Sequence, residues 1–211
     1  MKTVAIITAG GTSSRFGNNN KLLEKVYGKE IIRYTVEAFE KSNVDEIVIC
    51  ANKTIISDLQ KMFTHKVIEG GSTRQESVYN GLKTVTCDYV LIHDGARPII
   101  TPEMINNTIS AAQKHSAVTV MTKTIDTIKE VEDGKIIRTI DRSKLYNTQT
   151  PQAFEYNLIK KAHEKLKGQS YTDDAGMIEA LGYDVYIVEG DYKNIKITTP
   201  SDIEMAKIYL K

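Results

Sequence analysis

Two kinds of hydrophobic spacing alternate along the 211-residue chain, and this alternation restricts the folds open to it. Continuous runs of apolar and β-branched residues occupy 3–7, 46–51, 89–92, 117–121 and 184–188. Such runs are typical of strands that are buried on both faces of a parallel sheet. Between them, apolar residues recur at helical intervals, as at Ile32, Val36 and Phe39. The order predicts an α/β fold with a doubly wound, mostly parallel, Rossmann-like sheet, whose ligands bind beyond the carboxyl ends of the strands.

Residues 123–150 depart from this alternation. They contain two short runs of period two, joined by Glu132-Asp133-Gly134, and Asp-Gly is a strong hairpin signal. We therefore expect one domain over 1–211 with a protruding β-arm at about 123–150. Two interpretations of the arm stay open from its residues: a solvated β-ribbon, and an arm that exchanges with a second subunit.

Composition excludes several classes of function. A formal net charge of +1 gives no global attraction for nucleic acid or for an anionic membrane, so any affinity for phosphate must be local. Cys50 and Cys87 lie in or beside apolar runs, as reduced core thiols do. No apolar run approaches the ~18 residues of a membrane span, and the N-terminus has no signal-peptide pattern. We expect a cytoplasmic protein.

The first predicted strand ends in a loop suited to an anion. Ala9, Gly10 and Gly11 follow the strand, and such a glycine pair lets successive backbone N–H groups converge on one ligand. Arg15 offers a planar fork for phosphate oxygens, and Lys21 offers a mobile point charge. Neither G-x-G-x-x-G nor the P-loop spacing is present. The alternative is an ordinary strand-to-helix turn with exposed cations.

Two further polar clusters lie near helix starts. The segment 69–78, EGGSTRQESV, has backbone donors and Ser77 that would fix a base or ribose; the alternative is a tight turn with Arg74 in solvent. The segment 194–202, NIKITTPSD, places Lys196 among β-branched residues just before a helix cap. A lysine in such a run is either an edge-strand gatekeeper or, opposite a phosphate, an electrostatic clamp.

A third cluster, LIHDGARP at 91–98, follows another predicted strand. Asp94 is the metal candidate, because Mg²⁺ is commonly held by one or two carboxylates together with substrate phosphates and waters. The small pair Gly95-Ala96 would let a ligand approach the backbone. Arg97 would orient the loop or meet an acidic ligand, and its alternative role is a structural salt bridge. We interpret His93 as a residue that orients this loop.

Seven motifs in order along nearly the whole chain resemble one family. They are TAGGTSSRFGNNNK, GGSTRQESV, HDGARP, DTIK, DRSKLYNTQTPQAF, TDDAGMIEALG and NIKITTPSD. Together they resemble the 2-C-methyl-D-erythritol 4-phosphate cytidylyltransferases of the non-mevalonate isoprenoid pathway. The resemblance implies a nucleotidyltransferase fold and the transfer of CMP from CTP to methylerythritol phosphate, with Mg²⁺ and release of pyrophosphate. It also implies a homodimer formed through the β-arm.

The resemblance assigns roles by position. The phosphate-clamping, catalytic cations are Arg15, Lys21 and Lys196. The nucleotide-binding positions are Ala9, Gly10, Gly11, Gly71, Ser77 and Gly95. Arg97, Thr127 and Arg142 match substrate-binding positions, the last two from the arm and in the partner's site, and Asp94 matches the metal-associated aspartate. We interpret Asp173-Asp174 as a helix start with carboxylates in its first turn.

Three alternatives remain. The first 25 residues are also similar to the nucleotidyltransferases that elaborate molybdopterin, but those lack the HDGARP, TPQ and TDD motifs found here. Ribitol-5-phosphate cytidylyltransferase of teichoic-acid synthesis shares the CTP loops, and DTIK, DRSKLYNTQ and TDDAGMIEALG favour the methylerythritol branch. A nucleotide-binding regulator without turnover is the alternative from another class. The sequence also departs from the family pattern at Ser13, Asn20 and Lys193, and Lys193 stands where some members of the family have an acidic residue.

Overall fold

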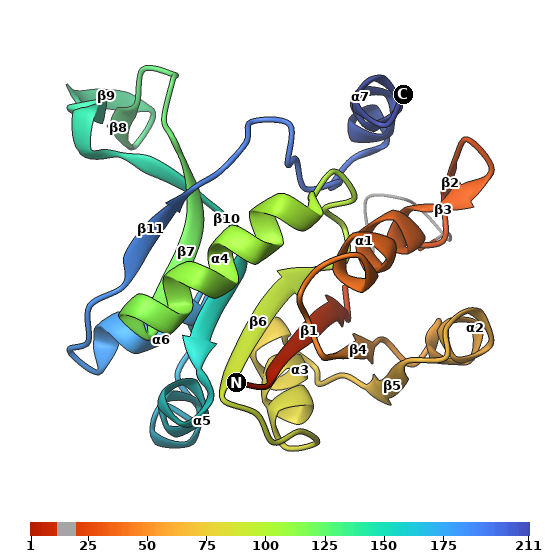
Figure 1. Cartoon of the computed structure of the whole chain (residues 1–211). Helices are drawn as coiled ribbons and strands as arrows, with labels where there is room; N and C mark the ends of the chain where they lie inside the picture. Colours follow the sequence, from red (N-terminus) through yellow and green to blue (C-terminus); the bar gives the residue numbers. More distant parts are fainter. Residues whose placement is uncertain (12–19) are drawn as a thin grey trace.

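The computed structural model describes residues 1–11 and 20–211, and within them seven strands form one mixed, mostly parallel sheet (Figure 1). The strand order is β11-β7-β10-β6-β1-β4-β5. In chain order the strands are β1 (Thr3–Ala9), β4 (Glu46–Ala51), β5 (Lys66–Glu69), β6 (Tyr89–Asp94), β7 (Ala117–Lys123), β10 (Tyr146–Glu155) and β11 (Tyr186–Glu189). Only β10 runs antiparallel to its neighbours in this sheet, β6 and β7. The predicted α/β, mostly parallel fold is confirmed.

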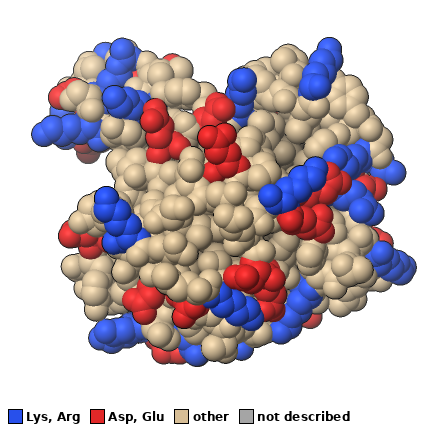
Figure 2. Space-filling model, in the orientation of Figure 1, with Lys and Arg blue, Asp and Glu red and all other residues tan. Residues whose placement is uncertain are grey.

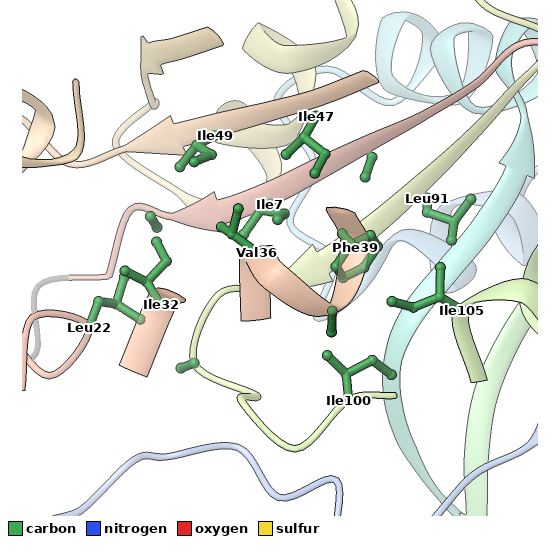
Figure 3. Packing of buried hydrophobic residues seen from close by; sticks show 14 of the residues in the cluster. Ile7, Leu22, Ile32, Val36, Phe39, Ile47, Ile49, Leu91, Ile100 and Ile105 are labelled. Carbon is green, nitrogen blue, oxygen red and sulfur yellow. The ribbon is translucent and has the colours of Figure 1, made fainter. Parts of the chain in front are cut away.

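Helices cover both faces of the sheet, as a doubly wound fold requires. One face packs against α1 (Ile31–Glu40), α2 (Ile56–Met62) and α4 (Pro102–His115), and the other against α3 (Arg74–Leu82), α5 (Tyr156–Lys165) and α6 (Asp174–Ala180). Alternation along β1 produces this division: Ile7 packs with the α1 side and Ile6 with the α3 side. Figure 3 shows Ile7 between Val36 and Phe39 of α1, within the first of these clusters.

The sheet places its topological switch point at the ends of β1 and β6. From β1 the chain moves outward through β4 and β5, then returns to form β6 on the other side of β1. Thr8 of β1 pairs with Asp94 of β6, so both strands end at the same level. In open α/β sheets, ligands bind in the crevice at this point.

The C-terminal segment packs in a small hydrophobic cluster that is separate from the two clusters on the faces of the sheet. Helix α7 (Pro200–Tyr209) begins at the predicted helix cap with a capping box, in which Asp202 accepts from the Thr199 backbone N–H. Ala206 of this helix packs with Ile197 and with Val26 of the short pair β2 (Lys25–Val26) and β3 (Lys29–Glu30). This packing holds the segment before α7 close to Lys21, whose Nζ donates to the Ile197 carbonyl.

The predicted hairpin is present and projects from the body of the sheet (Figure 1). Strands β8 (Lys129–Glu132) and β9 (Lys135–Thr139) are joined by Asp133 and Gly134, with φ of 48° and 78°. Two successive positive φ values are the geometry of a type I′ turn, for which Asp-Gly is a preferred pair. Residues 146–150, at the end of the predicted arm, belong to β10 in the main sheet.

Surface charge and helix length agree with the composition. Figure 2 shows Lys and Arg interspersed with Asp and Glu over the visible face, without a large field of one sign. In the described part of the chain, no helix has the length and apolar character needed to cross a membrane. A cytoplasmic location stays a prediction.

Candidate active site

A cavity of about 310 Å³ lies at the carboxyl ends of β1 and β6. Its lining includes most of the predicted loop residues, from four segments far apart in the sequence: Ala9, Gly10, Gly11, Lys21, Ser77, Asp94 and Lys196. Ser72, Thr73 and Arg74 line it as well. The structure therefore brings the predicted phosphate and metal residues together at the switch point. Arg15 lies outside the described residues.

Asp94 is surrounded by three cations. Its carboxylate lies 2.9 Å from Lys196 Nζ, 3.3 Å from Arg74 Nε and 3.5 Å from Arg97 Nε, and its side chain is 9% exposed. Burial alone would raise the pKa of Asp94, but Lys196, Arg74 and Arg97 outweigh it and hold that pKa well below its usual range. Asp94 is therefore an ionised, buried carboxylate within a cluster of excess positive charge.

Arg74 is directed inward, so the alternative of a solvent-exposed arginine is wrong. Thr73 caps α3 by accepting from the Glu76 backbone N–H, which makes Arg74 the first residue of the helix. From there its guanidinium contacts Asp94 through Nε and donates to Asp174 Oδ2 through Nη1 at 2.7 Å. Burial lowers the pKa of Arg74, but the two carboxylates more than compensate and raise it.

A second cavity, of about 220 Å³, adjoins the first and shares Arg74, Asp94 and Lys196 with it. The rest of its lining includes Arg97 and residues of β10 and the loop before α6: Thr148, Gln149, Thr150, Gln152, Thr172 and Asp173. The charged cluster around Asp94 thus forms the wall common to both cavities. Two anionic groups entering from the two sides would meet at these cations.

The turn that carries Asp94 is fixed by buried hydrogen bonds to β10. The Thr150 hydroxyl accepts from the Asp94 backbone N–H at 3.1 Å and donates to His93 Nδ1 at 3.0 Å. His93 Nε2 then donates to the Arg97 carbonyl at 3.4 Å. Burial lowers the pKa of His93 to about 3, so the ring is neutral at pH 7. This geometry agrees with a His93 that orients the loop.

The segment that carries Lys196 is anchored on both sides. Lys21 Nζ donates to the Ile197 carbonyl at 2.6 Å, and Arg97 Nη1 donates to the Asn194 carbonyl at 2.7 Å. The buried Asn194 amide donates in turn to the Thr150 carbonyl at 3.0 Å. Sequence reasoning missed Thr150 and Asn194 as supports. Their signals were the TPQ and NIK motifs, within which only Lys196 was given a role.

Close backbone approach explains two of the predicted glycines. A Cβ at Gly71 would lie 2.1 Å from Glu76 Cβ, and its N–H donates to Ser77 Oγ at 3.0 Å. A Cβ at Gly95 would lie 3.0 Å from the Thr8 carbonyl oxygen, to which the Gly95 N–H donates at 2.9 Å. Each glycine is a chain neighbour of lining residues of the first cavity, Gly71 of Ser72 and Gly95 of Asp94 and Ala96. Their contact with a nucleotide stays a prediction.

The two arm residues lie away from these cavities within one chain. Thr127 and Arg142 are exposed, and the Arg142 guanidinium donates to the Ile125 carbonyl of the same arm. In the described part of the chain, neither residue lines the two cavities around Asp94. Their role in the partner's site stays a prediction.

The residues around Asp94 could hold Mg²⁺ only together with a bound substrate. Among residues 1–11 and 20–211, no group of three or more His, Cys, Asp or Glu side chains is placed to hold a metal ion. Within those same residues, Asp94 alone contributes a carboxylate to the first cavity. A single carboxylate suits Mg²⁺ that is held mainly by substrate phosphates and water.

A doubly wound sheet with glycines, two lysines and one buried aspartate at its switch point defines this chain as a nucleotidyltransferase. The family model described as "IspD: 2-C-methyl-D-erythritol 4-phosphate cytidylyltransferase" matches residues 3–211. The chain belongs to this family.

Curated relatives and solved structures agree with this assignment. The chain is 42% identical over 224 residues to 2-C-methyl-D-erythritol 4-phosphate cytidylyltransferase of Clostridium perfringens (strain SM101), covering 100% of this chain and 99% of the relative. The crystal structure of 4-diphosphocytidyl-2C-methyl-D-erythritol synthase from Anaerococcus prevotii matches with a TM-score of 0.85 at 34% identity. The match covers 99% of this chain and 96% of that one. The crystal structure of 2-C-methyl-D-erythritol 4-phosphate cytidylyltransferase from Thermus thermophilus matches with a TM-score of 0.83 at 29% identity. The match covers 100% of this chain and 99% of that one.

Proposed function

We propose that this chain transfers CMP from CTP to 2-C-methyl-D-erythritol 4-phosphate and releases pyrophosphate. The observation that carries the proposal is the charged wall between the two cavities, in which Asp94 is held by Lys196, Arg74 and Arg97. Such a wall suits a reaction that brings two anions together. Family membership supplies the identity of the two substrates.

The chemistry requires positioning and charge neutralisation rather than a strong base. A phosphate oxygen of the acceptor attacks the α-phosphorus of CTP in line, and pyrophosphate leaves from the opposite side. A phosphate monoester is already a nucleophile near neutral pH, so the protein supplies cations at the phosphorus where negative charge grows. We assign this role to Lys21 and Lys196, together with Arg15.

The first cavity suits the nucleotide and the second suits the acceptor. Gly10 and Gly11 present backbone to the first cavity, and Ser77 lies at its wall for the sugar or base. Arg97 lines the second cavity and would meet the acceptor. Mg²⁺ bound at Asp94 would neutralise the triphosphate.

We further propose a homodimer in which the arm completes the partner's site. The arm is exposed, with Ile136 at 63% and Val131 at 55%, although large apolar side chains normally avoid water. Thr127 and Arg142 would then reach the acceptor phosphate of the other subunit. In this proposal residues 1–211 form one nucleotidyltransferase domain, with the arm at about 123–150 as its subdomain.

The test is pyrophosphate release by the pure protein with Mg²⁺ and CTP, run in parallel with methylerythritol 4-phosphate and ribitol 5-phosphate. We expect release with the first acceptor only. Release with ribitol 5-phosphate alone would move the protein to teichoic-acid synthesis and keep the CTP site. No release with either acceptor would favour a nucleotide-binding regulator and overturn the proposal.

A further inference from the structure

A buried chain of charged and polar groups lies behind the site and contacts it at one point. Asp174, in the first turn of α6, has a side chain that is 1% exposed and accepts from Arg74 Nη1 at 2.7 Å. Its other oxygen lies 3.3 Å from His163 Nε2 of α5, whose side chain is also 1% exposed. The His163 ring stacks on Tyr79 of α3, with centroids 5.9 Å apart and an interplanar angle of 7°.

Asp174 is itself held from β10. Its backbone N–H donates to Gln152 Oε1 at 3.0 Å, while the Gln152 amide donates to Asp173 Oδ2 at 2.8 Å. Because Asp173 also caps α6 by accepting from the Gly176 N–H, the carboxylate of Asp174 has little freedom to move. The pKa of Asp174 is lowered: burial would raise it, but Arg74 and His163 outweigh the burial.

Arg74 is therefore divided between two buried carboxylates. Its Nη1 makes the short contact with Asp174, and its Nε makes the longer one, 3.3 Å, with Asp94. Among the described residues, Asp174 lines neither of the two cavities around Asp94, whereas Arg74 lines both. Among the described residues, Asp174 is therefore linked by ion pairs to the site only through the guanidinium of Arg74.

We propose that Asp174 is a positioning residue for the transfer step, which holds Arg74 in the wall between the two cavities and prevents it from binding Asp94 alone. His163 supports Asp174 from behind. Without Asp174, the buried guanidinium of Arg74 would have one carboxylate left and would pair more closely with Asp94, the residue that must remain available to other cations. This inference rests on the proposed function, because it concerns the rate of that transfer.

The first test is Asp174→Asn, which keeps the shape of the side chain and removes its charge. We expect kcat to fall roughly 10- to 100-fold, as small misplacements in a site do, with the KM for CTP close to the wild-type value. The matched control is Glu179→Gln, an exposed charge on the same helix, which should leave both constants unchanged. His163→Phe keeps the stack on Tyr79 but removes the donor, and should lower kcat by a smaller factor.

A double-mutant cycle separates positioning from folding. Asp174→Asn leaves a buried arginine short of a partner and should lower stability, whereas Arg74→Gln/Asp174→Asn leaves no unpaired charge between them and should recover it. If Asp174 acts through Arg74, the double variant has the same kcat as Arg74→Gln alone. The double variant is nevertheless more stable than Arg74→Gln. Stability is measured by denaturant unfolding of each variant.

The outcomes are distinct. A wild-type kcat in Asp174→Asn would overturn the inference. So would a double variant whose fold-loss of kcat is the product of the losses in the two single variants. Either result would leave the proposed function intact. Failure of the wild-type protein to release pyrophosphate with either acceptor would overturn the proposed function and this inference with it.

Discussion

Replacing Lys196 by alanine tests its part in catalysis separately from its part in folding. Lys196 Nζ lies 2.9 Å from Asp94, but its side chain is 40% exposed, and Asp94 keeps Arg74 and Arg97 when it is gone. Because the lysine is this exposed and the buried Asp94 keeps two other cations, we expect the pair to contribute about 0–1 kcal/mol to stability. Loss of one preorganised charge or donor at the reacting centre costs about 10²- to 10³-fold in kcat, or ~2.7–4 kcal/mol.

We therefore expect Lys196→Ala to lower kcat by two to three orders of magnitude with little change in the unfolding free energy. The assay is pyrophosphate release at saturating CTP, with denaturant unfolding in parallel. The matched control is Lys207→Ala on α7, because Lys207 pairs with Glu204 at 2.7 Å and is 41% exposed. Near-normal turnover in Lys196→Ala would refute its role as a cation at the reacting phosphates. A large loss of stability would refute the reasoning from exposure.

Three further outcomes are expected. A chelator should abolish turnover and added Mg²⁺ should restore it; unchanged turnover of metal-stripped protein would remove Asp94 from its metal role. The wild-type chain should sediment as a dimer, and Val131→Asp/Ile136→Asp, at a cross-strand pair on the arm, should shift it to monomer; a wild-type monomer at all concentrations would exclude the exchanged arm. Burial raises the pKa of Asp202, but hydrogen bonds from Thr198 and Thr199 outweigh it and leave that pKa lowered. Its stabilisation is thus present above the unfolded pKa of about 3.9 and lost as pH falls below that value. Asp202→Asn should flatten the acid loss of stability seen in denaturant titrations between about pH 5 and 2, and a slope equal to that of the wild type would contradict the assignment.

The sequence determined the features that local physics controls. Continuous apolar runs predicted β1, β4 and β6, and the Asp133-Gly134 pair predicted the hairpin turn. The helix cap in the segment 194–202 predicted the start of α7. Each of these signals spans only a few residues, so no distant partner is needed to interpret it. The motifs at the strand ends also predicted the switch-point cavity, because parallel strands that end at one edge bring their loops together.

Only the tertiary structure decided how β10 and Arg74 are used. β10 was not among the predicted apolar runs. Its residues 146–155 enter the sheet antiparallel between β6 and β7, and this pairing depends on strands that lie earlier in the chain. Arg74 had two open interpretations because its partner, Asp174, lies 100 residues further on. Whether an arginine faces solvent or a buried carboxylate depends on which residues the fold places beside it. The spacing of neighbouring residues in the sequence does not predict them.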